Sequence, residues 1–278
     1  MRTRTGGGPT RRQALSLLLN VTALRSAAPG RWRSEEIRRF KAPEANQAVA
    51  VDAAHVYAIG NHVIAKYDKR TGERVAGWEC ETGRPLMHLN SGVVREGVLY
   101  CAHSNYPGVP MVSSIEMWET KTLRHSGSHS FGIFGGSATW IDFQAAHRYV
   151  TFAHYGNRAA EPNRDPKWTT LIQFDAEWRH VQGWVYPEEV IAKLGDYSIS
   201  GGVFAGEGRI FCTGHDNPEI YVLRFPQGGS TLVLEDTFAV PNQGQGIARD
   251  ASDPGTLYAI DRAKGEVIVM RVRPDRQE

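Results

Sequence analysis

The sequence has few of the features that identify an enzyme or a membrane protein directly. Only three of its 278 residues are cysteines, and none lies in a C-x-x-C spacing, so neither a zinc knuckle nor a dithiol redox site is indicated. No apolar run reaches the roughly 18 to 20 residues that a membrane-spanning helix needs. The motifs H-E-x-x-H, H-x-H and G-x-S-x-G are also missing, so no hydrolase motif identifies a reaction.

Acidic residues are missing from the first 33 positions, which carry seven arginines. Because the formal net charge of the whole chain is only +2, the remainder is net acidic, which argues against nucleic acid as a partner. Arg11 and Arg12 are followed by an apolar run from Ala14 to Leu24, and this pattern resembles a bacterial twin-arginine export signal. We therefore expect a periplasmic or secreted protein. A mitochondrial presequence, or a disordered tail on a cytoplasmic protein, is the alternative.

The rest of the chain contains a repeat of short apolar strands separated by turns. The first strand of each copy opens on small or polar residues: NQAVAVD (46–52), NSGVVRE (90–96), SATWID (137–142), SGGVFAG (200–206) and GQGIARD (244–250). Equivalent positions in successive copies are 44, 47, 63 and 44 residues apart. Four short strands in a period of about 40 to 50 residues are typical of a β-propeller blade. The third copy also contains PEEVIAKLG (187–195), which predicts a short helix.

The fifth copy ends near Val272 with only three strands, whereas an extra strand-like segment, Glu35–Pro43, precedes the first copy. Pairing this segment with the last blade would close the ring and remove two exposed sheet edges. We therefore predict an all-β protein, a five-bladed β-propeller closed by an N-terminal outer strand. Residues 34–273 would form this single domain, between a leader of residues 1–33 and a tail of residues 274–278.

A small-molecule site is predicted at the mouth of the central channel, because the first strand of each propeller blade lines that channel. The polar residues that open these strands, or directly precede them, are candidates for ligand binding: Gln47, His88, Asn90, Ser200 and Gln245. Tyr106 and Trp140 could offer flat faces to a ligand. The structural alternative is that small and polar residues simply fit the crowded axis, and that the aromatic rings pack between blades.

Histidines recur at the ends of the predicted second strands. His103 and His154 share one register, and His215 lies one position later in its copy. Imidazole can act as a general base or bind a divalent metal, so these three residues are the catalytic candidates, although the metal ligands themselves are not defined. The alternative is that these side chains only form hydrogen bonds with loop carbonyls where a sheet ends.

The repeat, with its YDKRTGE hairpin, resembles bacterial propellers of the TolB-like and lactonase-like types and the five-bladed glutaminyl cyclases. The resemblance covers about residues 42–273 and is architectural. It implies the propeller fold alone, and no catalytic residue is carried over from these families. From the twin-arginine pattern, the polar strand openings and the histidines, the first hypothesis is an exported propeller that binds a small molecule at the channel mouth, with metal-assisted hydrolase, lyase or cyclase activity as one possibility to test. The alternative is a non-catalytic interaction module that binds another protein of the cell envelope. In either case we expect a monomer.

Overall fold

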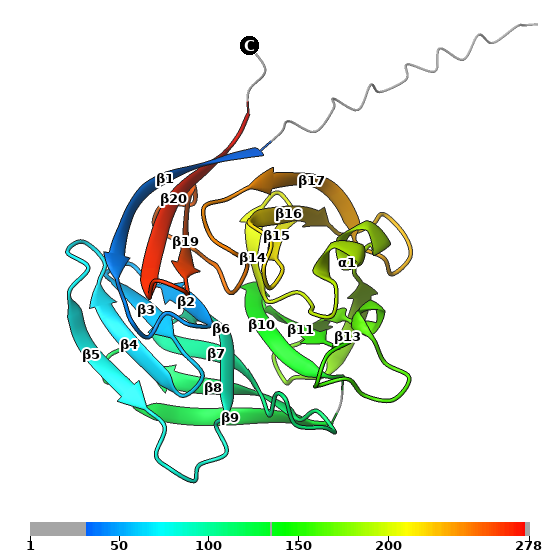
Figure 1. The fold of residues 1–278 in the computed structure, drawn as a ribbon, viewed down its shortest axis with the longest axis horizontal. Coiled ribbons are helices and arrows are strands. Elements are labelled where there is room, and N and C mark those ends of the chain that lie inside the picture. The colour runs from blue at the N-terminus through cyan, green and yellow to red at the C-terminus, as the bar shows by residue number, and fades with distance from the viewer. Residues whose placement is uncertain (1–31, 134, 276–278) are drawn as a thin grey trace, which may run out of the picture.

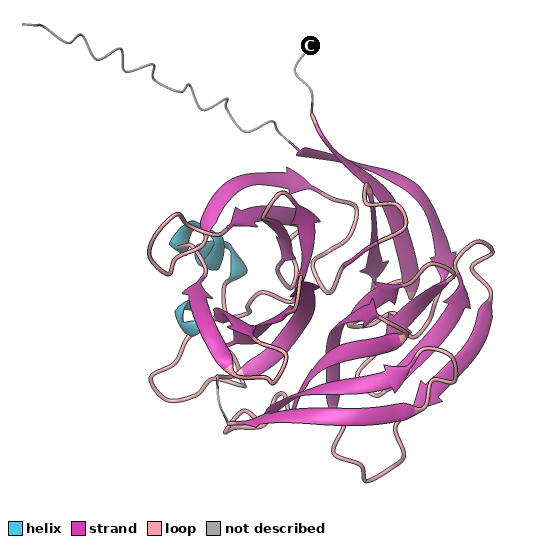
Figure 2. Cartoon of the chain, turned by 180° about the vertical axis from the view of Figure 1, so that it is seen from behind, coloured by secondary structure: helices cyan, strands magenta, loops and turns pink. Residues whose placement is uncertain are grey.

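Five four-stranded antiparallel sheets are arranged around a central axis (Figure 1). The structure is a computed structural model that describes residues 32–133 and 135–275. The predicted all-β, five-bladed propeller is therefore confirmed. The predicted leader falls almost entirely on residues 1–31, which lie outside the described residues. Strands make up nearly all of the regular secondary structure, as Figure 2 shows from behind, and loops join them.

Each blade contains four strands in chain order from the axis outward, except that the last blade takes its outer strand from the N-terminus. Blade 1 consists of β2 (Ala48–Val51), β3 (His55–Ile59), β4 (Val63–Asp68) and β5 (Arg74–Glu79). Blade 2 consists of β6 (His88–Arg95), β7 (Val98–Ser104), β8 (Ser113–Glu119) and β9 (His125–Gly132). Blade 3 consists of β10 (Ser137–Gln144), β11 (His147–Ala153), β12 (Thr170–Phe174) and β13 (His180–Val185). Blade 4 consists of β14 (Gly201–Gly206), β15 (Arg209–Thr213), β16 (Glu219–Arg224) and β17 (Val233–Ala239). Blade 5 consists of β18 (Ala248–Arg249), β19 (Thr256–Asp261), β20 (Glu266–Pro274) and β1 (Trp32–Lys41).

The blades are held together by five separate apolar clusters, one at each interface between neighbouring blades. Tyr57 and Trp118 are fully buried between blades 1 and 2, and Trp140 and Tyr221 are fully buried between blades 3 and 4. Burying one such side chain contributes about 1.5–3 kcal/mol. Each blade therefore buries apolar side chains against both of its neighbours.

The ring is closed by β1, which pairs antiparallel with β20 along its whole length (Figure 1). This confirms the predicted closure, with a strand that begins three residues earlier than Glu35 and ends two residues before Pro43. The start of the strand also reaches blade 4, where the Trp32 ring lies 4.9 Å from the Phe211 ring. The closing strand therefore links blades 4 and 5 as well as completing the last sheet.

The described residues contain two short helices, which lie at one side of the disc (Figure 2). The predicted helix is present as α1 (Glu188–Leu194), and a 3₁₀ helix, η1 (Pro166–Trp168), belongs to the long loop of blade 3. Glu188 and Glu189 occupy the first turn of α1 and Lys193 its last turn, which suits the helix dipole. Neither helix has the length and apolar character that crossing a bilayer requires.

Replacing Phe40 in the closing strand should destabilise the propeller. The Phe40 ring is half-buried and lies 5.8 Å from the Tyr67 ring at the interface of blades 1 and 5. We expect Phe40→Ala to lower the free energy of unfolding by about 2 kcal/mol, less than a fully buried Phe would cost. The control is Ile37→Ala on the same strand, where the side chain is 52% exposed and the change should stay below about 0.5 kcal/mol. Equal effects in urea denaturation would contradict a role of β1 in holding the ring.

Candidate functional site

A polar pocket of about 360 Å³ occupies one mouth of the central channel, on the face where the inner strands begin. All five blades contribute to its wall. The lining residues are Asn46, Gln47, Asn61, Met87, His88, Asn90, Tyr106, Pro107, Thr139, Tyr155, Arg158, Tyr197, Ser200, His215, Gln245 and Arg262. Seven residues that the sequence singled out are thus brought together: Gln47, His88, Asn90, Tyr106, Ser200, His215 and Gln245.

The pocket has a floor, formed where inner strands of different blades touch at the axis. The Ser91 hydroxyl of blade 2 donates to the Ser200 carbonyl of blade 4 at 3.4 Å. A Cβ atom at Gly246 would lie 2.3 Å from Ser91 Oγ and 2.4 Å from Ala48 Cβ, so only glycine fits there. Residues just beyond this level, including Gly92, Gly202 and Ile247, line a second cavity on the far side. The pocket is therefore a cup with a closed end and not an open channel.

Two β-bulges supply polar side chains to the pocket. In blade 2 the pairing of β6 with β7 shifts between Leu89 and Gly92, and Asn90 lies in this bulge. In blade 3 the pairing of β10 with β11 shifts between Ala138 and Trp140, and Thr139 is the unpaired residue. A bulge turns a side chain away from its regular strand direction, and bulges are frequent beside functional sites. Both bulges here serve the same mouth.

Blade 5 reaches the pocket through Gln245, which has a left-handed backbone conformation with φ of 67°. This conformation is unfavourable for a residue other than glycine by roughly 1–3 kcal/mol. Hydrogen bonds hold it in place: its amide N–H donates to the Gly214 carbonyl at 2.9 Å, and its carbonyl accepts from Thr213 Oγ1 at 2.5 Å. Its side-chain amide donates to the His215 carbonyl at 2.9 Å. Strain that the surroundings maintain at a cavity wall is typical of a functional position.

His88 is the half-buried imidazole in the wall of the pocket. Its ring lies 5.1 Å from the Tyr106 ring, and its nitrogens have no hydrogen-bond partner among the described residues. Burial, with a contribution from the nearby His103 and Arg262, lowers the pKa of His88 to about 4. At neutral pH it is therefore uncharged, with one donor and one acceptor nitrogen available to a ligand.

His215 differs from His88 because both of its nitrogens are engaged. Its ring stacks on Tyr197 at 3.8 Å, with the two planes inclined by only 5°. Nδ1 lies 2.6 Å from Asp216 Oδ1, and Arg262 Nη1 lies 3.3 Å from Nε2. Because arginine can only donate, Nε2 is the acceptor and Nδ1 carries the proton that is donated to Asp216. Burial lowers the pKa of His215 and the hydrogen bond to Asp216 opposes this. His215 thus orients Arg262 toward the pocket.

The other two catalytic candidates, His103 and His154, are not among the residues that line the pocket. His103 is buried: the Met87 amide donates to its Nε2 at 3.1 Å, and its Nδ1 lies 2.9 Å from Ser114 Oγ. His154 is also buried, with Nδ1 3.1 Å from Glu161 Oε2. Burial lowers the pKa of both groups. These hydrogen bonds hold both imidazoles inside the protein near the ends of the second strands.

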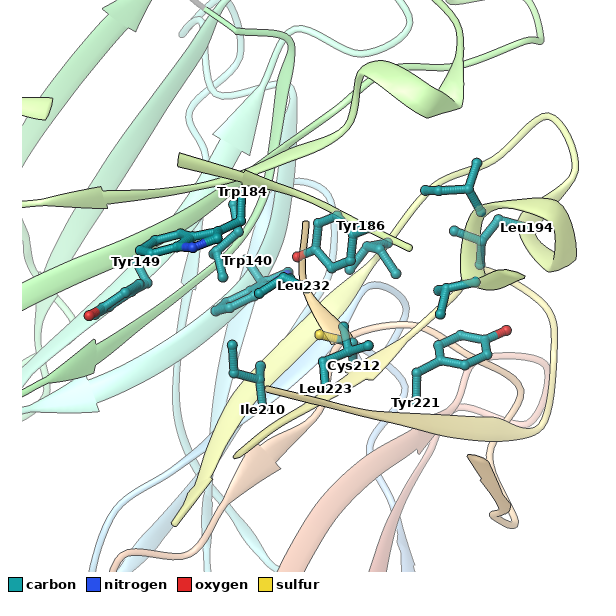
Figure 3. Close-up of a cluster of buried hydrophobic side chains, with 14 of the residues drawn as sticks. Trp140, Tyr149, Trp184, Tyr186, Leu194, Ile210, Cys212, Tyr221, Leu223 and Leu232 are labelled. Carbon is teal, nitrogen blue, oxygen red and sulfur yellow. The ribbon is translucent and has the colours of Figure 1, made fainter. Parts of the chain in front are cut away.

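Trp140 also lies away from the pocket. Figure 3 shows it among buried side chains at the interface of blades 3 and 4, near Tyr186 and Cys212. Its ring packs on Gly202, where an added Cβ would lie 2.3 Å from Trp140 Cε2. The preceding bulge residue, Thr139, lines the pocket, whereas Trp140 belongs to the apolar cluster between the blades. The expected stacking face is therefore used for packing between blades.

Nine lining residues are not among the seven named above, and four of these matter for the chemistry of the wall: Thr139, Arg158, Tyr197 and Arg262. Arg158 lies in the long loop after β11, whose length was the one sequence signal that pointed toward it. Arg262 lies in the short turn between β19 and β20, and no local pattern distinguishes it from other turn arginines. With these two guanidinium groups and no Asp or Glu in the described lining, the wall of the pocket is positively charged.

The cavity on the opposite face is more apolar. It measures about 320 Å³ and is lined mainly by Val, Ile, Phe and small residues of the inner strands, together with Arg95, Asp142 and Arg249. Its buried acid, Asp142, already accepts hydrogen bonds from the backbone N–H groups of Phe143 and Phe204, at 2.7 Å each. Burial raises the pKa of Asp142 to about 6. Among the described residues, no cluster of three or more His, Cys, Asp or Glu side chains is arranged to hold a metal ion.

The depressed pKa of His88 predicts a specific loss of stability in acid. Because the unfolded chain binds a proton near pH 6.5 and the folded protein only near pH 4, the free energy of unfolding should fall as the pH drops between these values. We expect His88 to account for about 1–2 kcal/mol of the difference in the free energy of unfolding between pH 7 and pH 5, measured by urea denaturation. In His88→Asn this difference should be smaller by that amount. NMR titration of the imidazole signal that disappears in the variant should give a midpoint near 4. A midpoint near 6.5 would contradict the buried, uncharged state.

Comparisons with known proteins extend the description of the fold but not of the function. No protein-family model matches the sequence, and no curated protein matches it. Among solved structures, the WD40 repeats of RRP9 align over 81% of this chain and 79% of theirs, with 10% identity and a TM-score of 0.48. A chain of a mitotic checkpoint complex aligns over 94% of this chain and 99% of its own, with 9% identity and a TM-score of 0.46. A structure of U3-55K covers 81% and 80%, with 9% identity and a TM-score of 0.45. These similarities are too low to support a function, and the assignment as a five-bladed propeller rests on the five sheets themselves.

Proposed function

We propose that the protein binds a small molecule in the polar pocket at the mouth of its central channel. The observation that carries this proposal is the convergence of polar side chains from all five blades on one closed-ended cavity. The volume of about 360 Å³ lies within the range of small-molecule sites, which is about 300–1,000 Å³. A cavity with a floor retains a ligand and does not conduct one through the disc.

Unsatisfied polar atoms in the wall support a bound ligand. Thr139 is only 3% exposed, and neither its hydroxyl nor Asn61 Oδ1 has a hydrogen-bond partner in the described part of the chain. Buried polar atoms nearly always have a partner, because leaving one without costs about 1–3 kcal/mol. A molecule in the pocket that offers donors and acceptors would supply the partners after small side-chain rotations.

The arrangement of the histidines favours binding over catalysis. His103 and His154 are engaged inside the protein, and the acceptor nitrogen of His215 already receives a hydrogen bond from Arg262. His88 keeps unpartnered nitrogens in the pocket, but among the described residues no hydrogen bond joins it to a hydroxyl or thiol that could act as a nucleophile. For this reason the hydrolase, lyase and cyclase hypotheses, and a metal cofactor, are not part of the proposal.

Thr139→Val tests the pocket, because valine keeps the shape of the side chain and removes the hydroxyl. We expect the variant to be more stable than the wild type by about 1 kcal/mol, since an unpartnered buried hydroxyl is lost. The control is Thr151→Val on the adjacent strand β11, where Thr151 Oγ1 lies 2.5 Å from the Tyr186 hydroxyl. There the same change should destabilise the protein by about 1 kcal/mol.

A thermal-shift screen of neutral, cationic and anionic metabolites then tests binding itself. Compounds that bind the folded protein raise its Tm, and the shift should shrink in Thr139→Val but not in Thr151→Val. If no compound shifts the Tm, or if every shift is equal in both variants, the proposal is wrong. If this protein instead bound a protein of the cell envelope, and no small molecule competed for that binding, the interaction module would be favoured.

Export by the twin-arginine route is part of the proposed biology, and it is supported only by the sequence pattern around Arg11 and Arg12. In a bacterium that has this pathway, the full chain should accumulate in the periplasm. Replacing both arginines by lysine should retain it in the cytoplasm. Arg25→Lys in the same segment is the control and should leave localisation unchanged. Identical fractionation of all three proteins would contradict twin-arginine export.

A further inference from the structure

We infer that the ligand of this pocket is an anionic, polyhydroxylated molecule of monosaccharide size, such as a sugar acid or a sugar phosphate. The inference rests on the proposed function and names the chemical class of the ligand. It follows from three features of the pocket. Arginines without a carboxylate partner in the described chain lie in its wall, side chains that carry both a donor and an acceptor line its interior, and its volume is small and closed at one end.

The positive charge comes from Arg158 and Arg262, which enter the pocket from blades 3 and 5. Neither guanidinium has a carboxylate partner among the described residues. Their neighbours do: Arg164 in the loop of Arg158 lies 3.7 Å from Glu161, and Lys264 in the turn of Arg262 lies 2.9 Å from Asp261. These neighbouring cations each have a carboxylate partner, so these loops do contain acids. In the same loops, the two guanidinium groups that line the pocket have no such partner in the part of the chain that the structure describes.

The two arginines are also held in place by the wall. Arg262 donates to Nε2 of His215, whose ring is fixed by its stacking on Tyr197. The Arg158 guanidinium lies 5.7 Å from the centre of the Tyr106 ring. A guanidinium that is oriented beforehand binds a carboxylate or a phosphate with two parallel hydrogen bonds. The body of the protein is net acidic, so these cations also give the mouth a charge opposite to that of its surroundings.

The interior of the pocket suits hydroxyl groups. It is lined by carboxamide and hydroxyl side chains from every blade, namely Asn46, Gln47, Asn61, Asn90, Thr139, Ser200 and Gln245. Asn90 Nδ2 already donates to the Ala138 carbonyl at 3.0 Å and Gln245 Nε2 to the His215 carbonyl at 2.9 Å, which leaves each amide one N–H and its oxygen for a ligand. A sugar hydroxyl can both donate and accept, so it can pair with these groups and with Asn61 Oδ1 and the Thr139 hydroxyl. The volume near the lower end of the range for small-molecule sites favours a single sugar unit over an oligosaccharide.

Isothermal titration calorimetry at low salt tests the inference with four probes: gluconate, glucose 6-phosphate, glucose and inorganic phosphate. We expect gluconate or glucose 6-phosphate to bind at least about ten-fold more tightly than glucose, because charge-assisted hydrogen bonds are strong. The better of the two identifies the acid group as carboxylate or phosphate. Inorganic phosphate should bind more weakly than glucose 6-phosphate, because it reaches none of the hydroxyl-binding groups.

Variants assign the effect to the two arginines. Arg158→Gln and Arg262→Gln should each weaken binding of the anionic probe about ten-fold or more. The controls Arg164→Gln and Lys264→Gln remove a positive charge from the same two loops outside the pocket and should change the affinity by less than about two-fold. All four side chains are exposed, so circular dichroism should show an intact fold in every variant.

The outcomes separate this inference from the proposed function. If glucose binds as tightly as the anions, or if the pocket and control variants behave alike, the inference is wrong. Binding of neutral compounds that Thr139→Val weakens would still support the pocket as a small-molecule site. If inorganic phosphate binds as tightly as glucose 6-phosphate, the polyhydroxyl part is wrong and the anion site alone stands.

Discussion

The structure depends on the close approach of five inner strands at one axis. Each of β2, β6, β10, β14 and β18 contacts the inner strands of both neighbouring blades, which leaves no room for large side chains at the centre. Gly246 meets this constraint against Ala48 and Ser91, and its amide donates to the Gln47 carbonyl across the junction of blades 5 and 1. The same contact closes the axis and forms the floor of the pocket. Ring geometry and binding cavity therefore have one physical origin.

Around that floor, irregular backbone takes the place of regular pairing. The bulges at Asn90 and Thr139 interrupt β6 and β10, and the left-handed Gln245 lies in the segment that leads into β18. Each irregularity loses ladder hydrogen bonds or adds strain, and each brings a polar side chain to the same mouth. On the opposite face Asp142 uses its hydrogen bonds to join two inner strands. One face of the disc thus stabilises the ring, while the other keeps polar groups available for binding.

The histidines show how similar sequence positions acquire different roles. His103 and His154 end equivalent strands and are used inside the protein to hold the Met87 amide and Glu161. His88 faces the cavity with unpartnered nitrogens, and His215 orients a guanidinium. Register alone could not separate these cases. A shift of one residue, or a neighbouring loop that supplies a hydrogen bond, decides whether an imidazole reaches the pocket or is buried beside it.

The sequence by itself determined the repeat, the number of blades, the helix near residue 190 and the strand that closes the ring, because these follow from local periodicity and from the need to pair sheet edges. It also identified much of the pocket wall, since Gln47, Asn90, Ser200 and Gln245 lie where inner strands begin. Only the tertiary structure decided that Trp140 packs between blades, that Thr139 faces the axis, and that Arg158 and Arg262 meet at one cavity. Side-chain direction at a bulge and the path of a loop depend on contacts between residues far apart in the chain, and no local pattern records them.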